Sequence, residues 1–301
     1  MELHYVHLDV FTDRALEGNQ LAVFLDGRGI EPALMQRIAR EMAFSESTFV
    51  LPPEGGGDVR MRIFTPFEEL PIAGHPTIGS AFALAHAGVV APGSARVVFE
   101  LGVGPTPVDL EWEPRGAGVE LSFAWMAQPR PVFGPTLEPR EALAALHLDP
   151  AQAADAPVQL VSCGVPYFLV PLRSRAAVDA ADPDAGALRR TFRADGAPRP
   201  VFLFTLEGAA DEATAYSRMF APDLGVPEDP ATGSASGPLG CYLVRHGLID
   251  AARARHFVSL QGVRMGRPSR IHVSIASDGG EITGVRVGGR AMIVGEGTLR
   301  I

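Results

Sequence analysis

The chain has 301 residues, of which 47% are apolar and 20% are charged, and its formal net charge is −9 at pH 7. This length and composition indicate a globular protein with room for two domains. Phosphate groups bind clustered cations, so the negative charge argues against nucleic acid and acidic membranes as partners. We find no apolar run of about 18 residues and no secretory leader, so we expect no membrane span and a cytoplasmic protein.

Lysine is absent from the sequence, and all 26 basic residues are arginine. This bias is typical of a GC-rich genome, but it also excludes chemistry that depends on a Schiff base or on a P-loop lysine. No Gly-x-Gly-x-x-Gly motif follows a predicted strand to open a helix. Two cysteines, Cys163 and Cys241, form neither a disulfide framework nor a zinc site. We therefore expect no metal and no cofactor.

The hydrophobic pattern predicts a series of short strands interrupted by two helices. In chain order, the first part contains predicted strands at 3–11, 21–25, 47–53, 59–64, 95–101, 106–112 and 118–123, with helices at 31–43 and from His75 to near Gly88. The Pro-rich segment 128–135 is interpreted as a linker, and the series of elements restarts after it.

Three segments of the chain match later segments in the same order. They are "GNQLAVFL" (18–25) with "GVPYFLVP" (164–171), "RIFTP" (62–66) with "RMFAP" (218–222), and "GHPTIGSAFALAHAGVV" (74–90) with "GSASGPLGCYLVRHGLI" (233–249). The last pair aligns without a gap. We infer two similar halves, roughly 1–125 and 126–301, related by a pseudo-twofold axis. In this arrangement the last strand crosses back to the first half.

Each half contains a predicted helix that begins at a glycine, Gly74 or Gly233. A helix start presents unpaired N–H groups and a partial positive charge, so two such starts facing one cleft would bind a carboxylate. The simpler interpretation is that these glycines only permit tight turns. Their repetition in both halves favours the binding site.

Four residues near these helix starts carry candidate chemistry: Glu46, His75, Asp229 and Ser234. Glu46 is flanked by Phe44 and Phe49, whose apolar side chains would desolvate a carboxyl group and suit it to acid/base work. Each residue also has a simpler interpretation. Glu46 fits an exposed strand edge, His75 fits a packed histidine, Asp229 fits a turn, and Ser234 fits a helix N-cap.

Longer motifs around these residues resemble the phenazine-biosynthesis PhzF-like isomerase family over essentially the whole chain. The motifs are "HLDVFTDRALEGNQLAVF" (7–24), "AFSESTFVLPP" (43–53), "RIFTPFEELPIAGHPTIGSA" (62–81), "RMFAPDLGVPEDPATGSASGPLGCYL" (218–243) and "QGVRMGRPSRI" (261–271). The paired segments "ELPIAGHPT" and "EDPATGSA" are the specific ones. One local departure is Gln20, which stands where the family commonly has proline.

The resemblance implies the α+β diaminopimelate-epimerase fold, in which two halves each curl a mostly antiparallel sheet around a central helix. It implies that Glu46 is the acid/base and that His75, Asp229 and Ser234 bind and orient a substrate in the cleft. The wider superfamily uses two cysteines, each directly before a helix glycine. Ala73 and Thr232 fill those positions here, which argues against a two-thiol racemase.

The expected function is a cofactor-independent proton shift on a small carboxylate-bearing metabolite, by double-bond migration or epimerisation, with a homodimer implied by the resemblance. Gly74 and Gly233 are expected to bind the substrate with the three orienting residues. One alternative is an amino-acid or hydroxyproline epimerase. Another is a non-catalytic protein that binds a small molecule on the same scaffold.

Overall fold

The computed structural model describes residues 1–301, and the chain divides into two compact units. Unit 1 comprises residues 1–127 and 288–301, and unit 2 comprises residues 128–287. The chain therefore leaves unit 1 once and returns to it for its last strand. No helix of either unit is long and apolar enough to cross a membrane.

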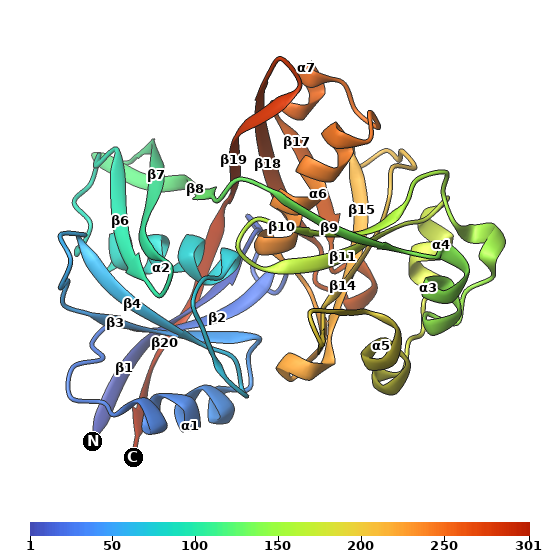
Figure 1. Ribbon diagram of the computed structural model, residues 1–301. Helices are drawn as coiled ribbons and strands as arrows, with labels where there is room; N and C mark the ends of the chain where they lie inside the picture. Colours follow the sequence, from blue (N-terminus) through green and yellow to red (C-terminus); the bar gives the residue numbers. More distant parts are fainter. The chain divides into compact units, whose positions relative to one another are not determined.

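Unit 1 is built on a sheet that mixes antiparallel and parallel pairs (Figure 1). Its strands are β1 (Glu2–Val10), β2 (Asn19–Phe24), β3 (Glu46–Leu51), β4 (Val59–Phe64), β5 (Glu69–Leu70), β6 (Arg96–Leu101), β7 (Gly104–Arg115), β8 (Gly118–Gln128) and β20 (Ala291–Arg300). Strand β2 is parallel to β3, and β4 is parallel to β6. The other pairs, from β20–β1 to β7–β8, are antiparallel. The pairing of β1 with β20 brings the two chain ends together.

The two helices of unit 1 are α1 (Pro32–Met42) and α2 (Gly74–His86), and they pack on opposite faces of the sheet. Met35 of α1 joins Phe49 in a buried apolar cluster. Helix α2 is buried from Gly74 to Leu84 and contacts β1, β2, β3, β7 and β20. A Cβ added at Gly79 would lie 2.6 Å from Cδ2 of Leu21. Glycine thus allows α2 to approach the strands closely.

Unit 2 is built on a second set of paired strands. They are β9 (Val132–Leu137), β10 (Val158–Ser162), β11 (Pro166–Pro171), β14 (Val201–Thr205), β15 (Ala215–Ala221), β16 (Val226–Asp229), β17 (Phe257–Gln261), β18 (Ser269–Asp278) and β19 (Glu281–Gly289), with a separate hairpin of β12 (Arg193–Ala194) and β13 (Ala197–Pro198). Strand β11 is parallel to β14, and β15 is parallel to β17. The pairs β9–β10, β10–β11, β14–β15, β15–β16 and β17–β18 are antiparallel.

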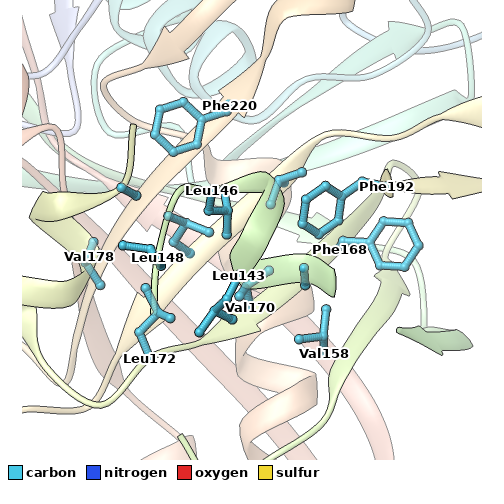
Figure 2. Close-up of a cluster of buried hydrophobic side chains, with 14 of the residues drawn as sticks. Leu143, Leu146, Leu148, Val158, Phe168, Val170, Leu172, Val178, Phe192 and Phe220 are labelled. Atoms are coloured by element: carbon cyan, nitrogen blue, oxygen red, sulfur yellow. The ribbon is translucent and has the colours of Figure 1, made fainter. Parts of the chain in front are cut away.

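Helix α6 (Gly233–Arg245) contacts β10, β11 and β18 of unit 2. The other helices of the unit are α3 (Pro139–Ala145), α4 (Arg175–Ala180), α5 (Ala185–Thr191), α7 (Ala251–Ala254) and the 3₁₀ helices η1 (Pro150–Gln152), η2 (Pro222–Leu224) and η3 (Val263–Met265). Figure 2 shows the apolar cluster in which Leu143, Phe168 and Phe192 pack together. This cluster joins α3, α4 and α5 to the strands, and it contains no residue of α6.

Helices α2 and α6 share local features at positions that the gap-free alignment pairs. Near their starts, Thr77 Oγ1 donates to the Ala73 carbonyl (2.7 Å) and Ser236 Oγ donates to the Thr232 carbonyl (3.0 Å). Each is followed by a glycine with positive φ, 71° at Gly88 and 63° at Gly247. Glycine adopts this conformation without a steric penalty.

The interpretation of 128–135 as a linker holds for residues 129–131, which connect β8 to β9 near the boundary between the units, and is wrong for the rest. Residue Gln128 ends β8, and β9 begins at Val132. The register of β9 against β10 shifts between the pairs formed by Phe133 and Thr136, so Pro135 lies at an irregularity in the ladder. Proline lacks an N–H group, and strands accommodate it at such bulges. Pro129 and Pro131 therefore lie in the connection, whereas Pro135 marks a strand irregularity.

Candidate active site

Glu46 and His75 lie in contact within unit 1. Glu46 is the first residue of β3, and His75 is in the first turn of α2. Glu46 Oε2 is 3.3 Å from His75 Nδ1, and the side chains are 15% and 3% exposed. The amide nitrogen of Asn19, at the start of β2, is 3.2 Å from the same Nδ1. Three chain segments thus bring a carboxyl, an imidazole and an amide group together.

Burial lowers the pKa of His75 from 6.5 to about 3, and a hydrogen bond with the backbone of Gln20 opposes this shift only in part. The imidazole is therefore neutral at pH 7, and its contact with Glu46 is not an ion pair. If the Asn19 amide nitrogen donates to Nδ1, the ring proton lies on Nε2, whereas the Glu46 carboxyl oxygen at the same Nδ1 favours the other tautomer. The buried Nε2 has no hydrogen-bond partner in the protein.

One of the two phenylalanines expected to desolvate Glu46 does not face it. Phe49 is three residues further along the strand and therefore faces the opposite side of the sheet, where it stacks on Phe24 with ring centroids 4.8 Å apart. Phe44 stacks on His7 at 4.8 Å. The start of α2, with His75, lies against Glu46 instead, which local sequence could not reveal.

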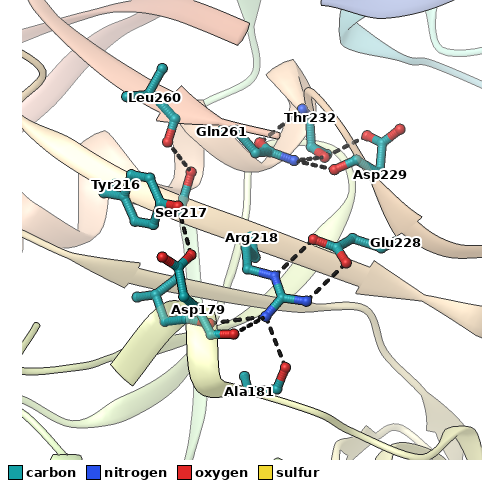
Figure 3. Close-up of polar contacts among 11 residues, drawn as sticks. Asp179, Ala181, Tyr216, Ser217, Arg218, Glu228, Asp229, Thr232, Leu260 and Gln261 are labelled. Atoms are coloured by element: carbon teal, nitrogen blue, oxygen red, sulfur yellow. Dashed lines mark hydrogen bonds and ion pairs between the residues drawn. The ribbon is translucent and has the colours of Figure 1, made fainter. Parts of the chain in front are cut away.

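Asp229 ends β16 in unit 2, and its side chain is part of a buried hydrogen-bond network (Figure 3). The Thr232 hydroxyl donates to Asp229 Oδ2 at 2.6 Å. Gln261, at the end of β17, donates from Nε2 to the Asp229 carbonyl at 2.7 Å. Asp229 is 5% exposed and Gln261 is fully buried. The aspartate is thus more than a turn former, since its carboxylate is held by a specific donor.

An ion pair fixes the residue next to Asp229. Arg218 of β15 forms two hydrogen bonds to Glu228, at 2.8 and 2.9 Å. The same guanidinium donates to the carbonyls of Val178 and Ala181 at 3.0 and 2.8 Å. Arg218 is 7% exposed, and a buried charge is stable only when its donors are used in this way. The network anchors the end of β16, as Figure 3 shows.

Ser234 is the second residue of α6, and its hydroxyl does not cap the helix. The N-cap residue is Thr232, whereas Ser234 Oγ is 2.7 Å from the hydroxyl of Tyr167 in β11. The Gln128 amide donates to the Gly233 carbonyl at 3.0 Å. Pro238 lies within α6 and has no N–H for the Ser234 carbonyl. The first turn of α6 is therefore held partly by side chains from other strands.

Four residues of these networks were missed by sequence reasoning as site residues. They are Asn19, Tyr167, Thr232 and Gln261. Asn19, Thr232 and Gln261 lie inside the motifs that carry the family resemblance, so the motifs gave a signal for them. Tyr167 lies in a strand whose sequence gives no polar pattern, and only the fold brings it to Ser234. The prediction that the four candidate residues line one cleft stays a prediction.

The two thiols lie together in unit 2. Cys163 Sγ and Cys241 Sγ are 3.8 Å apart, both are buried, and neither forms a disulfide. A hydrogen bond with Cys163 and burial raise the pKa of the Cys241 thiol. A racemase thiol must be a thiolate to accept a proton from carbon, so this environment disfavours such a role.

Comparison with known proteins places these features in a family. The model of a family described as phenazine biosynthesis-like protein (PhzC-PhzF) matches residues 8–297. The trans-2,3-dihydro-3-hydroxyanthranilate isomerase of Pseudomonas aeruginosa is 40% identical over 293 residues, covering 97% of this chain and 98% of that protein.

Solved structures agree with this match. The phenazine biosynthesis protein of the PhzF family from Bacillus anthracis superimposes with a TM-score of 0.88 and 25% identity over the full length of both chains. A probable proline racemase from Agrobacterium radiobacter gives a TM-score of 0.66 at 14% identity, covering 99% of this chain and 93% of that one. The second likeness concerns the fold alone.

The sheet-rich fold is therefore of the PhzF and proline-racemase type. The chain belongs to the phenazine-biosynthesis PhzF-like family and is an isomerase. The expectation drawn from the motifs is confirmed at this level.

Proposed function

We propose that the protein catalyses a cofactor-independent proton shift on a small carboxylate-bearing metabolite, with Glu46 as the general acid/base. In this proposal the two units are pseudo-symmetric repeats, and Glu46, His75, Asp229 and Ser234 act on the same substrate. The shared local features of α2 and α6 support the repeat. The isomerase names of relatives at about 40% identity support the reaction class.

The observation that carries the proposal is the buried, neutral His75 beside Glu46. Its Nε2 has no partner in the protein, and a buried polar group without a partner costs about 1–3 kcal/mol. With the ring proton on Nε2, a substrate oxygen placed at the start of α2 would supply the missing acceptor. The unpaired N–H groups of the first turn would add an anion-binding field. A ligand carboxylate satisfies both requirements.

The chemistry requires one proton to leave carbon and one to return. Glu46 accepts the proton, and the electrons of the broken C–H bond delocalise into an adjoining conjugated group of the substrate. The same carboxyl group then returns a proton to another carbon, which completes double-bond migration. Epimerisation would instead require a second acid to deliver a proton to the opposite face of the same carbon. His75 stays neutral and donates a hydrogen bond throughout, while Asp229 and Ser234 orient the substrate.

Two rival functions differ in their requirements. A two-thiol epimerase would need an acidic thiol in front of each helix glycine, but Ala73 and Thr232 stand there. A binding protein would need no acid/base. The contact of Glu46 with a neutral imidazole at a helix start favours chemistry over binding alone.

The test uses trans-2,3-dihydro-3-hydroxyanthranilate, the compound named for the relatives, as the probe, in deuterated water at neutral pH. Proton NMR of the recovered compounds measures deuterium at carbon. We expect carbon-bound deuterium in the product of the native protein and none with Glu46→Gln. Binding of the probe without exchange would support the binding protein, and exchange retained in Glu46→Gln would contradict the role of Glu46.

We also propose a homodimer and no nucleic-acid or membrane partner. Light scattering at micromolar concentration measures the molar mass of the chain in solution. A mass that matches one chain would refute the dimer.

A further inference from the structure

A chain of three buried polar side chains ends at the Asp229 carboxylate in unit 2. Gln261 is fully buried, and Thr232 and Asp229 are each 5% exposed. Gln261 Nε2 is 3.0 Å from Thr232 Oγ1, which is 2.6 Å from Asp229 Oδ2. Figure 3 shows the three side chains in this sequence. The chain links the end of β17, the N-cap of α6 and the end of β16.

The orientation of the Gln261 amide is fixed by two backbone groups. Its Oε1 accepts from the Thr232 N–H at 3.0 Å, and its Nε2 donates to the Asp229 carbonyl at 2.7 Å. An N–H group only donates and a carbonyl only accepts, so exchanging the amide oxygen and nitrogen would break both bonds. Nε2 is therefore the atom that faces Thr232.

This orientation decides where the Thr232 proton points. Nε2 of Gln261 donates to Oγ1, so the hydroxyl hydrogen cannot occupy that direction. The other polar side-chain atom at Oγ1 is Asp229 Oδ2. A buried hydroxyl whose hydrogen pointed elsewhere would lose a hydrogen bond. The hydroxyl therefore donates to the carboxylate, and the relay has one direction, from Gln261 to Thr232 to Asp229.

We propose that Thr232 is a positioning residue, and that its hydroxyl, oriented by Gln261, holds Asp229 as an anion in one rotamer. A hydrogen bond donated to a carboxylate favours its charged form. Asp229 then acts toward the substrate as an acceptor of a hydrogen bond or a proton. This inference rests on the proposed function, which gives Asp229 a place in the site. Thr232 would thus fill a superfamily cysteine position with a residue that orients another acid.

The first test measures the titration of Asp229 directly and needs no substrate. The protein is labelled with ¹³C at the aspartate carboxyl carbon, and Asp229→Asn identifies the Asp229 signal. Thr232→Val keeps the side-chain shape but removes the hydroxyl. In this variant we expect the titration midpoint of the Asp229 carboxyl to rise by about one to two pH units, the equivalent of one charge-assisted hydrogen bond. Thr232→Ser should restore the native midpoint.

Neighbouring charges and a matched control separate this effect from general damage. Glu228, the neighbour of Asp229 in the chain, forms an ion pair with Arg218 that does not involve Thr232. Ser236→Ala removes another buried hydroxyl, which donates to the Thr232 carbonyl rather than to Asp229. We expect no shift in this variant. Thr232→Ala is a smaller replacement, and it should show the same rise if Thr232→Val does not fold.

The second test separates failure of this inference from failure of the proposed function. With the same probe substrate, Thr232→Val should lower kcat/KM about tenfold and move the acid limb of its pH profile upward. An unchanged Asp229 midpoint in Thr232→Val and Thr232→Ala would overturn the relay, whatever the activity. If the midpoint rises but Asp229→Asn keeps native activity, the relay stands and the catalytic placement of Asp229 is wrong.

Discussion

The starts of α2 and α6 have similar backbones but different side-chain chemistry. Both helices begin at a glycine. In both, a hydroxyl in the first turn donates a hydrogen bond to the carbonyl of the residue that precedes this glycine. At α2 that preceding residue is Ala73, and His75 is buried with an unpartnered Nε2. At α6 it is Thr232, whose hydroxyl is used twice, and Ser234 is bonded to Tyr167.

The difference indicates a division of labour between the two helix starts. Around α2, the buried Nε2 of His75 has no hydrogen-bond partner. This arrangement costs free energy, which a bound ligand would recover. Around α6, the hydroxyls of Thr232 and Ser234 are hydrogen-bonded within the protein, which fixes their positions, although the buried Gln128 Oε1 has no partner. We interpret the start of α2 as the region whose hydrogen bonds change when a ligand binds. We interpret the start of α6 as a region whose side chains are already held in place by the protein.

Glu46→Gln should produce the largest effect, because it removes the titrating group while keeping the size of the side chain. Acid/base groups contribute about 10²–10⁴-fold in rate. We expect kcat for the probe substrate to fall by at least that order, with KM changed little. Steady-state kinetics measures both parameters.

The control for this change is Glu41→Gln, a carboxyl lost from an exposed position of α1. Its kcat should be native. If Glu46→Gln also turns over at a near-native rate, Glu46 is not the acid/base and Asp229 becomes the candidate. The division of labour between the helix starts would then be reversed.

His75→Ala should have the next largest effect and should differ from Glu46→Gln in kind. It removes both a hydrogen bond to the ligand and the group against Glu46, so we expect kcat/KM to fall about 10–100-fold with a raised KM. Asp229→Asn should also change both parameters. Isothermal titration with an unreactive substrate analogue provides the affinity. Unchanged affinity in His75→Ala would contradict a ligand bond to Nε2.

The sequence predicted the elements well where their pattern was local. The strand at 59–64 is found as β4 with the same ends, and the helix start at the Gly74–His75 pair is confirmed. The gap-free alignment also predicted that Gly88 and Gly247 follow their helices. These features depend on neighbouring residues and on glycine conformations, so a short stretch of sequence is enough to predict them.

The sequence could not predict contacts that depend on tertiary structure. Glu46 was expected beside Phe49, but β-strand alternation puts Phe49 on the other face. The bond from Tyr167 to Ser234 joins residues in different elements, and no local pattern encodes it. The sequence also gave no indication that Cys163 and Cys241 lie next to each other in space. Candidate residue types were predictable, whereas their partners were not.

The pH dependence of stability should reveal the unpartnered histidine of α2. Unfolded His75 takes up a proton with a pKa of 6.5, whereas the folded protein holds that pKa at about 3. Between these values the unfolded state binds more protons, so the free energy of unfolding falls as the pH falls. This contribution is fully present above pH 6.5 and is lost at about 1.4 kcal/mol per pH unit below it.

Urea denaturation of the native protein and of His75→Gln, each at pH 7.5 and at pH 5.5, measures this effect. Glutamine does not titrate, so the variant should lack the histidine term. We expect the native protein to lose about 1.4 kcal/mol more than the variant over this interval. Equal losses would mean that His75 is solvated or protonated in the folded protein, and the contrast with α6 would disappear.

Tyr167→Phe should have the smallest effect, because it tests the rigid region around α6. The change removes one hydroxyl from its bond to Ser234 and keeps the ring. A neutral hydrogen bond contributes about 0.5–1.5 kcal/mol net, which corresponds to about 2–10-fold in kcat/KM. A double-mutant cycle with Ser234→Ala isolates the pair. If the bond orients Ser234 toward the substrate, the double variant should be no worse than Ser234→Ala alone. Fully additive losses would show that Tyr167 and Ser234 act separately, and that the Ser234 hydroxyl is not held in place by β11.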